Sequence, residues 1–258
     1  MMKLSEMYKN NIENINRLRD HTKKFITGTN KIDIETILLS GSVQRGDYFY
    51  PPLKGCIDLT VMVKEGTKTT AEEIFGPNES TIPFHVVKWN GEYFQIAFHE
   101  FITCDRFKKL LEPKKFALLE SKIIYDPNKN YKKELLEIKK IAKNEQKEFL
   151  QKTKNNINYI IGKNPKWERR GAICCMHQNL NYAIHLGLKC LYYLNNKYAP
   201  ADDRLLYYTF ELEKLPKNYE KLLEEIAKQK YNSKKDYERR IKLFKEEFIT
   251  VLKNANSA

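Results

Sequence analysis

Residues 38–47 read Leu-Leu-Ser-Gly-Ser-Val-Gln-Arg-Gly-Asp, and residues 56–63 read Cys-Ile-Asp-Leu-Thr-Val-Met-Val. The apolar run before Ser40 predicts a strand that ends in Gly41-Ser42, and the run after Asp58 predicts a second strand. A Gly-Ser pair at the end of a strand leaves backbone N–H groups and a hydroxyl at the edge of the sheet. Together with an acid near the start of the next strand, this arrangement is suited to holding a metal-bound triphosphate.

The chain is strongly basic. Its 258 residues include 46 Lys and Arg against 33 Asp and Glu, which gives a net charge of +13. An excess of this size attracts polyanions such as nucleotides, nucleic acid or an anionic membrane surface. The abundance of Lys, Asn, Ile and Tyr is also typical of an AT-rich genome, so the charge alone does not assign a partner. The length suffices for one large domain or two modest ones, each with a real core.

Cysteine usage and hydropathy bear on the compartment. The five cysteines, two of them adjacent at Cys174 and Cys175, do not form the pattern of a secreted disulfide framework. The first thirty residues lack the apolar core of a signal peptide, and no stretch approaches the roughly twenty apolar residues of a membrane span. We therefore expect a cytoplasmic protein with no membrane segment.

The first half of the chain has the pattern of a mixed α/β domain. Helical spacing of apolar residues predicts an amphipathic helix over residues 4–27, ended by Gly28. Strands are predicted over residues 34–39 and 57–63, and a hairpin of residues 84–89 and 93–98 turns at Asn90-Gly91. A helix over residues 107–122 and a short strand over residues 123–125 complete this half.

After about residue 130 the chain becomes rich in Lys, Glu and Leu and has few turn signals. It predicts helical segments over residues 131–154, 167–194, 202–215, 218–229 and 234–252, with a frayed tail over residues 254–258. We therefore expect an α+β protein with two domains. Residues 1–130 would form a mixed sheet with flanking helices, and residues 131–258 would form an all-α bundle.

The predicted strand ends bring together a phosphate site and a metal site. Gly41 and Ser42 would cradle the terminal phosphates of a nucleotide, and Arg45 lies three residues further on. Side chains alternate across a strand, so positions 56 and 58 point to the same side, where Mg²⁺ ligands would lie.

At these residues the chain resembles the nucleotidyltransferase superfamily of the DNA polymerase β type. The signature of that superfamily is Gly-Ser followed, after about ten residues, by Asp-x-Asp. The resemblance covers Gly41, Ser42, Arg45, Gly46 and Asp58, and residues 120–126 are similar to the last helix and strand of that domain. Residues 193–200, Tyr-Leu-Asn-Asn-Lys-Tyr-Ala-Pro, are similar to a segment in the helical C-terminal domain of the aminoglycoside-type members.

The resemblance implies a reaction. Members of this superfamily bind an NTP with Mg²⁺ and transfer a nucleoside monophosphate to an acceptor with loss of pyrophosphate. Gly41, Ser42 and Arg45 would then bind the nucleotide, and Asp58 would be both the catalytic residue and a metal ligand. The acceptor, which the sequence does not identify, would be a small molecule, a protein or an RNA terminus, and the oligomeric state is likewise open.

Members of the superfamily carry a third acid, on the later strand of the hairpin, and the chain departs from this pattern at two of the three acids. The first acidic position holds Cys56, whose sulfur is a poor ligand for hard Mg²⁺, and the third corresponds to Gln95, which offers a neutral oxygen. Asp47, His99 and Glu100 are the residues available to compensate. A second hypothesis is therefore a degenerate member that keeps the fold and binds a nucleotide or a partner without turnover.

The second half contains polar residues with several possible roles. Arg170 and His177, on one predicted helix, are spaced like the Arg-x(four to six)-His pattern of HEPN-class ribonucleases, where such a pair acts on an RNA phosphate. Cys174, His177 and Asn181 form a stripe that would suit contact with a nucleotide or simple helix packing. A zinc site made of Cys174, His177, His185 and Cys190 is disfavoured, because these residues lack the usual spacing of zinc ligands.

Overall fold

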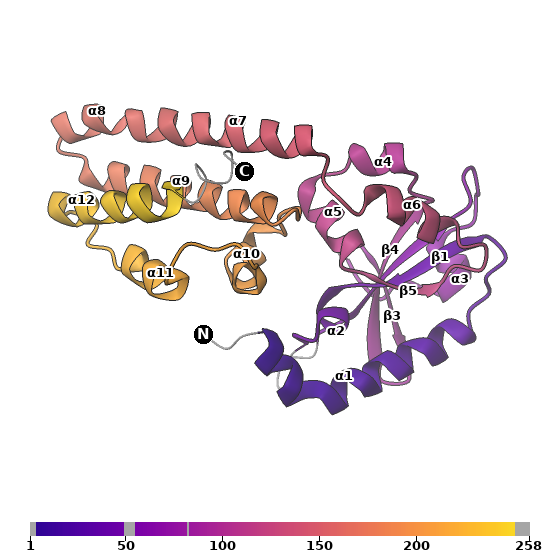
Figure 1. The fold of residues 1–258 in the computed structure, drawn as a ribbon. Helices are drawn as coiled ribbons and strands as arrows, with labels where there is room; N and C mark the ends of the chain where they lie inside the picture. The colour runs from indigo at the N-terminus through magenta and orange to yellow at the C-terminus, as the bar shows by residue number, and fades with distance from the viewer. Residues whose placement is uncertain (1–3, 49–54, 82, 251–258) are drawn as a thin grey trace. The chain divides into compact units, whose positions relative to one another are not determined.

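The computed structural model describes residues 4–48, 55–81 and 83–250. The tail expected over residues 254–258 lies outside the described residues. The chain divides into two compact units, Met1–Lys139 and Lys140–Ala258 (Figure 1). The first unit extends past residue 130 to include α6 (Asn130–Ile138), which packs against α4 (Cys104–Lys108). One link between them is the hydrogen bond that the Cys104 backbone N–H donates to the Glu134 carboxylate at 2.6 Å.

The described residues of the first unit form one mixed, five-stranded sheet. Its strands, in chain order, are β1 (Ile34–Leu39), β2 (Ile57–Val63), β3 (His85–Trp89), β4 (Glu92–Glu100) and β5 (Lys122–Tyr125). Their order in the sheet is β3-β4-β2-β1-β5. Neighbouring strands are antiparallel except β2 and β4, which are parallel. The predicted hairpin is confirmed, and both Asn90 and Gly91 have the positive φ that its tight turn requires.

One face of the sheet packs on α1 (Leu4–Thr27), the predicted N-terminal helix (Figure 1). Ile15 and Leu18 are fully buried on this helix, and the Phe25 ring stacks on Phe94 with 4.1 Å between the ring centroids. The strands contribute the alternate residues that share this face, among them Ile37, Leu39, Ile57, Leu59 and Ile96. Burying several such side chains, at about 1.5–3 kcal/mol each, explains why a helix of mostly polar residues stays attached.

Figure 1 shows α4, α5 (Glu112–Leu119) and α6 on the side of the sheet away from α1. The single helix predicted over residues 107–122 is wrong, because the structure divides it into α4 and α5. Leu111 is extended and caps α5, and Pro113 lies in the first turn of that helix, where its missing N–H costs nothing. A further helix, α3 (Ala71–Phe75), begins with a capping box made by Thr70 and Glu73.

A helix rather than a simple turn follows β1. Residues Gly41–Arg45 form α2, which ends at Gly46 with φ of 94°. The carbonyl oxygen of Ser42 accepts hydrogen bonds from the N–H groups of Gly46 and Asp47 at 2.8 and 3.1 Å. The Gly-Ser pair therefore opens a helical turn directly at the end of a strand.

The described residues of the second unit are all helical or connecting. Its elements are α7 (Lys143–Gly162), α8 (Asn164–Arg169), α9 (Ile173–Leu194), α10 (Asp202–Leu205), the 3₁₀ segment η1 (Tyr207–Glu211), α11 (Tyr219–Ala227), α12 (Lys234–Leu243) and the π-helical segment η2 (Phe244–Phe248). Helices α7, α8 and α12 pack against α9, which has the longest buried stripe. The α+β fold class predicted from the sequence is confirmed.

The predicted helix over residues 167–194 is interrupted. Helix α8 ends at Arg169, Gly171 has φ of 66°, and α9 begins at Ile173. A left-handed glycine after the last turn is a common way to end a helix, and here it separates Arg170 from the helix that carries His177.

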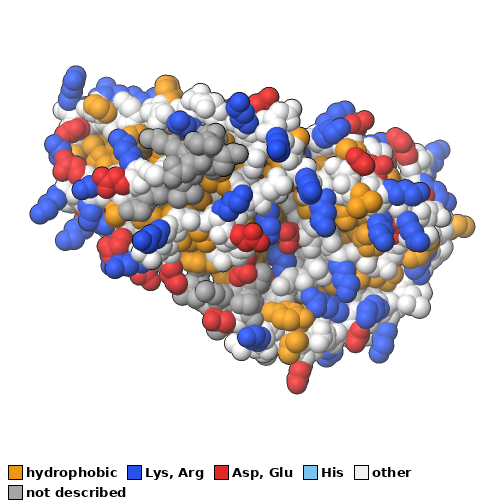
Figure 2. All heavy atoms as spheres, in the orientation of Figure 1, with side chains coloured by type: hydrophobic (Ala, Val, Ile, Leu, Met, Phe, Trp, Pro, Cys, Tyr) orange, Lys and Arg blue, Asp and Glu red, His pale blue; other side chains and the backbone are white. Residues whose placement is uncertain are grey.

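Charged side chains cover much of the face shown in Figure 2, where Lys and Arg are interleaved with Asp and Glu over both units. Among the helices that the structure describes, none has both the length and the hydropathy needed to cross a membrane.

Candidate functional site

The antiparallel pairing of β1 and β2 places Gly41 and Asp58 at one corner of the sheet. Leu39 pairs with Leu59, so the chain after β1 leaves the sheet beside the start of β2. The Ser40 backbone N–H donates to the Asp58 carbonyl oxygen at 2.9 Å, and the Ser40 hydroxyl reaches the same oxygen at 3.3 Å. The strand pairing thus continues one residue past β1 and fixes the start of α2 against Asp58.

The carboxylate of Asp58 lies directly against Gly41. A Cβ atom built on Gly41 would meet Asp58 Oδ2 at 1.7 Å and Cγ at 2.6 Å, far inside van der Waals contact. Gly41 also has φ of 66°, a backbone conformation that glycine adopts readily and that residues with a Cβ atom rarely adopt. The corner therefore requires glycine for two reasons, and it holds the acid over the first turn of α2.

Gln95 is the neighbour of Asp58 in the sheet. The two residues are paired in the parallel register of β2 and β4, and both are half-buried. Paired residues on adjacent strands, which lie about 4.8 Å apart, project to the same face. That face is the one opposite α1, because Leu59 and Phe94 on the other face belong to the α1 core. The amide of Gln95 thus stands where a second carboxylate would serve a metal.

Cys56 immediately precedes β2 and is half-buried. Burial raises the pKa of its thiol, and the nearby negative charge of Asp58 raises that pKa further. The thiol is therefore protonated at neutral pH. A protonated sulfur is not a ligand for a hard cation such as Mg²⁺.

Arg45 points into the protein. Its side chain is 7% exposed, and its Nε atom lies 3.7 Å from Oδ1 of Asp47, whose side chain is 13% exposed. The pair lies at the turn that follows α2, which is closed by the hydrogen bonds from the Gly46 and Asp47 N–H groups to the Ser42 carbonyl oxygen. The guanidinium is thus held beside Asp47, which neutralises its charge within the same loop.

His99 and Glu100 lie away from the corner. They pair with Met62 and Val63, so His99 is four residues, or about 13 Å, along β4 from Gln95. The carboxylate of Glu100 accepts from the Gly66 N–H and pairs with Arg106 at 2.9 Å, interactions that lower the pKa of Glu100. Within the described part of the chain, no three His, Cys, Asp or Glu side chains gather in a way that would hold a metal ion. Asp58 is thus the acid that the corner retains.

The chain is similar in structure to a nucleotidyltransferase-like protein. That protein is from Exiguobacterium sibiricum 255-15, and the match covers 87% of this chain and 69% of the other, with a TM-score of 0.45 and 13% sequence identity. No protein-family model and no curated protein matches the sequence.

His177 lies in the interior of the second unit rather than on a surface. Its ring is fully buried; Nδ1 accepts a hydrogen bond from Arg240 Nη1 at 2.8 Å, and Nε2 lies 3.2 Å from the carbonyl oxygen of Ser233. Nε2 therefore carries the hydrogen, and both ring nitrogens are engaged. Arg170, by contrast, is exposed and its guanidinium stacks over Trp167 at 5.1 Å. The predicted placement of Arg170 and His177 on one helix is wrong, since the helix is interrupted at Gly171.

Arg240 organises the interior around His177, and the sequence contained no signal of it. The guanidinium is 2% exposed and also donates to the Ile226 carbonyl at 2.6 Å and to Asn181 Oδ1 at 2.6 Å. Asn181 in turn donates to Gln229 at 3.1 Å. His177 and Asn181, expected as ligand contacts or as packing groups, thus join α9 to α11 and α12.

We predict that His177→Ala destabilises the protein by about 2–4 kcal/mol, because it leaves a buried donor of Arg240 without its acceptor and opens a cavity. Urea unfolding measures the change. The control is His185→Ala, which removes a partly exposed ring 3.3 Å from the exposed carboxylate of Asp202 and should cost less than about 1 kcal/mol. Equal effects of the two substitutions, or RNA cleavage that depends on His177 in a stably folded protein, would contradict this role.

We predict that Asp58→Asn lowers the pKa of Cys56 and speeds its alkylation by iodoacetamide. The folded thiol has a raised pKa, so its reactive thiolate is scarce at pH 8 and increases as the pH rises towards that pKa. Removing the negative charge of Asp58 removes one of the two causes, and the rate profile should move to lower pH. Peptide mass spectrometry separates Cys56 from the other four cysteines, and Glu72→Gln, on exposed α3, is the control. An unchanged profile for Asp58→Asn would rule out the inferred electrostatic contact.

Proposed function

We propose that the corner formed by Gly41, Ser42, Asp58 and Gln95 binds a nucleoside triphosphate together with Mg²⁺. The observation that carries the proposal is the packing of the Asp58 carboxylate onto Gly41, at a position that any side chain on residue 41 would fill. This packing puts a hard oxygen ligand beside the start of α2.

The start of α2 supplies the groups that phosphates need. The first N–H groups of a helix lack acceptors within the helix, and Ser42 adds a hydroxyl in the same turn. The Gly41-Ser42 turn would therefore donate hydrogen bonds to phosphate oxygens. Arg45, in contrast, is buried beside Asp47 and would support the turn rather than contact the phosphates directly.

The donor set fits one Mg²⁺ ion that arrives with the triphosphate. Mg²⁺ in nucleotide sites is commonly held by one or two carboxylates, substrate phosphates and water. Asp58 would supply the carboxylate, and Gln95 the neutral oxygen. When bound, the ion would offset the negative charge of the phosphates. The set does not fit a centre with two metal ions, because Cys56 is protonated and Gln95 carries no charge.

Binding without turnover is the function that this set of residues supports best. Activation of an acceptor hydroxyl needs a base, and Asp47, His99 and Glu100 are each engaged or placed elsewhere. The second candidate is transfer of a nucleoside monophosphate to a small molecule, a protein or an RNA terminus. The retained Asp58 carboxylate favours it.

We predict that Mg²⁺ with an NTP raises the melting temperature of the wild-type protein, and that Asp58→Asn loses the part of this increase that depends on Mg²⁺. A ligand at about 100 times its Kd stabilises the native state by about 2.7 kcal/mol, which a thermal-shift assay detects readily. The assay compares four NTPs with and without Mg²⁺. Glu72→Gln removes the same charge from exposed α3 and should behave as the wild type.

Two further measurements separate the candidates. Pyrophosphate release by the wild-type protein, abolished in Asp58→Asn, would establish transfer and overturn binding without turnover. If the corner has lost its metal affinity through Cys56 and Gln95, the double variant Cys56→Asp, Gln95→Asp should bind Mg²⁺ more tightly than the wild type. An absence of any NTP-dependent stabilisation in the wild-type protein would contradict both candidates.

A further inference from the structure

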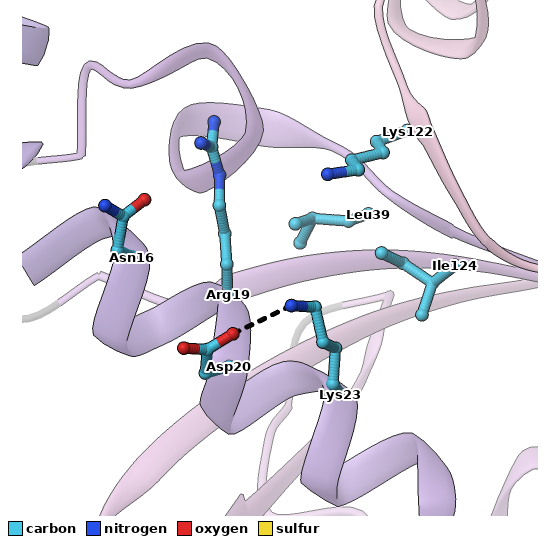
Figure 3. Close-up of a pocket in the computed structure, with 7 residues that line it drawn as sticks. All are labelled: Asn16, Arg19, Asp20, Lys23, Leu39, Lys122 and Ile124. Carbon is cyan, nitrogen blue, oxygen red and sulfur yellow. Dashed lines mark hydrogen bonds and ion pairs between the residues drawn. The ribbon is translucent and has the colours of Figure 1, made fainter.

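A cavity lies on the face of the sheet opposite to the Asp58 side chain. It has a volume of about 290 Å³ and is formed by α1, the end of β1 and the edge strand β5 (Figure 3). Its lining residues are Asn16, Arg19, Asp20, Lys23, Leu39, Lys122 and Ile124. Leu39 pairs with both Leu59 and Lys122, so these three side chains share the α1 face, whereas Asp58 projects to the other. This cavity is therefore separate from the Asp58 corner.

The lining is strongly cationic. Arg19, Lys23 and Lys122 contribute three positive charges, and Asp20 contributes one negative charge, so the net charge is +2. Figure 3 shows the amines of Lys23 and Lys122 on either side of Leu39, with Arg19 extending past it towards α2. The single carboxylate is already committed, because Asp20 Oδ1 lies 2.8 Å from Lys23 Nζ. Among the lining residues, no further acid is present to offset Arg19 and Lys122.

The contacts of those two cations leave their charges uncompensated. Among the described residues, Arg19 has only uncharged hydrogen-bond partners: the Gln44 carbonyl at 2.7 Å and the Tyr8 hydroxyl at 3.3 Å. Its Nε donor is buried and meets no acceptor there. Lys122 forms no ion pair within the described part of the chain. The positive charges gathered around the cavity repel each other, which costs free energy. A bound anion would replace this repulsion by attraction.

We propose that this cavity binds a compact phosphate anion, either free or as the terminal group of a small phosphorylated molecule. A net charge of +2 matches a phosphate dianion, and ammonium and guanidinium groups are its usual donors in proteins. The volume lies just below the range of about 300–1,000 Å³ that is typical of pockets for drug-sized ligands. The cavity thus suits a phosphoryl group with a short substituent. The proposal does not depend on what the Asp58 corner binds.

Charge substitutions around the cavity test the proposal by isothermal titration calorimetry of the whole protein with inorganic phosphate and with methyl phosphate. Lys122→Gln should weaken binding by about twofold to fivefold, since it removes one exposed positive charge that faces the anion. Asp20→Asn should tighten binding, because it removes the only negative charge and releases Lys23. Lys24→Gln is the matched control; it neutralises an exposed lysine on α1 that does not line the cavity. Arg19 is left intact because it also holds α2 through Gln44.

Binding of both ligands would identify a terminal phosphoryl group as sufficient, and binding of inorganic phosphate alone would identify a site for the free ion. Each result supports the proposal if Lys122→Gln weakens the binding and Lys24→Gln leaves it unchanged. The proposal would be overturned by equal effects of Lys122→Gln and Lys24→Gln, or by weaker phosphate binding in Asp20→Asn. It would also be overturned if neither ligand bound saturably to the wild-type protein. Glu72→Gln, which removes one negative charge from exposed α3 as Asp20→Asn does from α1, should leave phosphate affinity within about twofold of wild type, whether or not the protein binds an NTP.

Discussion

The contact between Gly41 and Asp58 is the constraint on which the first unit depends. The Ser40 N–H bonds the Asp58 carbonyl, the Asp58 side chain folds over Gly41, and α2 begins in the same turn. A larger residue at position 41 would displace the acid, the helix or both. This close approach, at the end of the paired strands β1 and β2, brings a carboxylate to a turn that carries N–H donors.

Around this contact the corner combines features of a ligand site with features that disfavour chemistry. The glycine, the serine and one carboxylate are those expected of a triphosphate site. A protonated Cys56 and a neutral Gln95 flank the carboxylate, so the negative charge available to a metal is a single unit. Under the proposed function, affinity for a nucleotide that brings its own Mg²⁺ would survive such a loss more readily than catalysis, which requires a base and a complete metal centre.

Sequence patterns predicted the strands and the first helix well because each carries a local signal. A run of apolar residues identified β2, helical spacing identified α1, and Asn90-Gly91 fixed the hairpin. They failed where an outcome depends on distant partners or on one backbone angle. The break at Gly171 depends on the positive φ of that residue, which the sequence does not give. The role of His177 depends on its contact with Arg240, which is 63 residues away in the sequence.

The candidate site shows the same division between local and distant information. Gly41, Ser42 and Asp58 were found from spacing, and their adjacency follows from the pairing of two strands. The burial of Arg45 against Asp47 was not predictable, since an arginine near a Gly-Ser pair is equally suited to solvent or to a phosphate. The cationic cavity escaped sequence analysis because its residues come from α1, β1 and β5, and their convergence exists only in the folded sheet.

The most direct test of a triphosphate site at this corner is paramagnetic broadening of backbone amide NMR signals by Mn²⁺ bound to a non-hydrolysable ATP analogue. The reference is the same sample with diamagnetic Mg²⁺. Our account predicts that the strongest broadening falls on Gly41, Ser42, Asp58 and Gln95, and that Asp58→Asn abolishes it. Broadening that spares these residues, or that centres on Arg19 and Lys122 instead, would contradict the assignment of the corner as the nucleotide site.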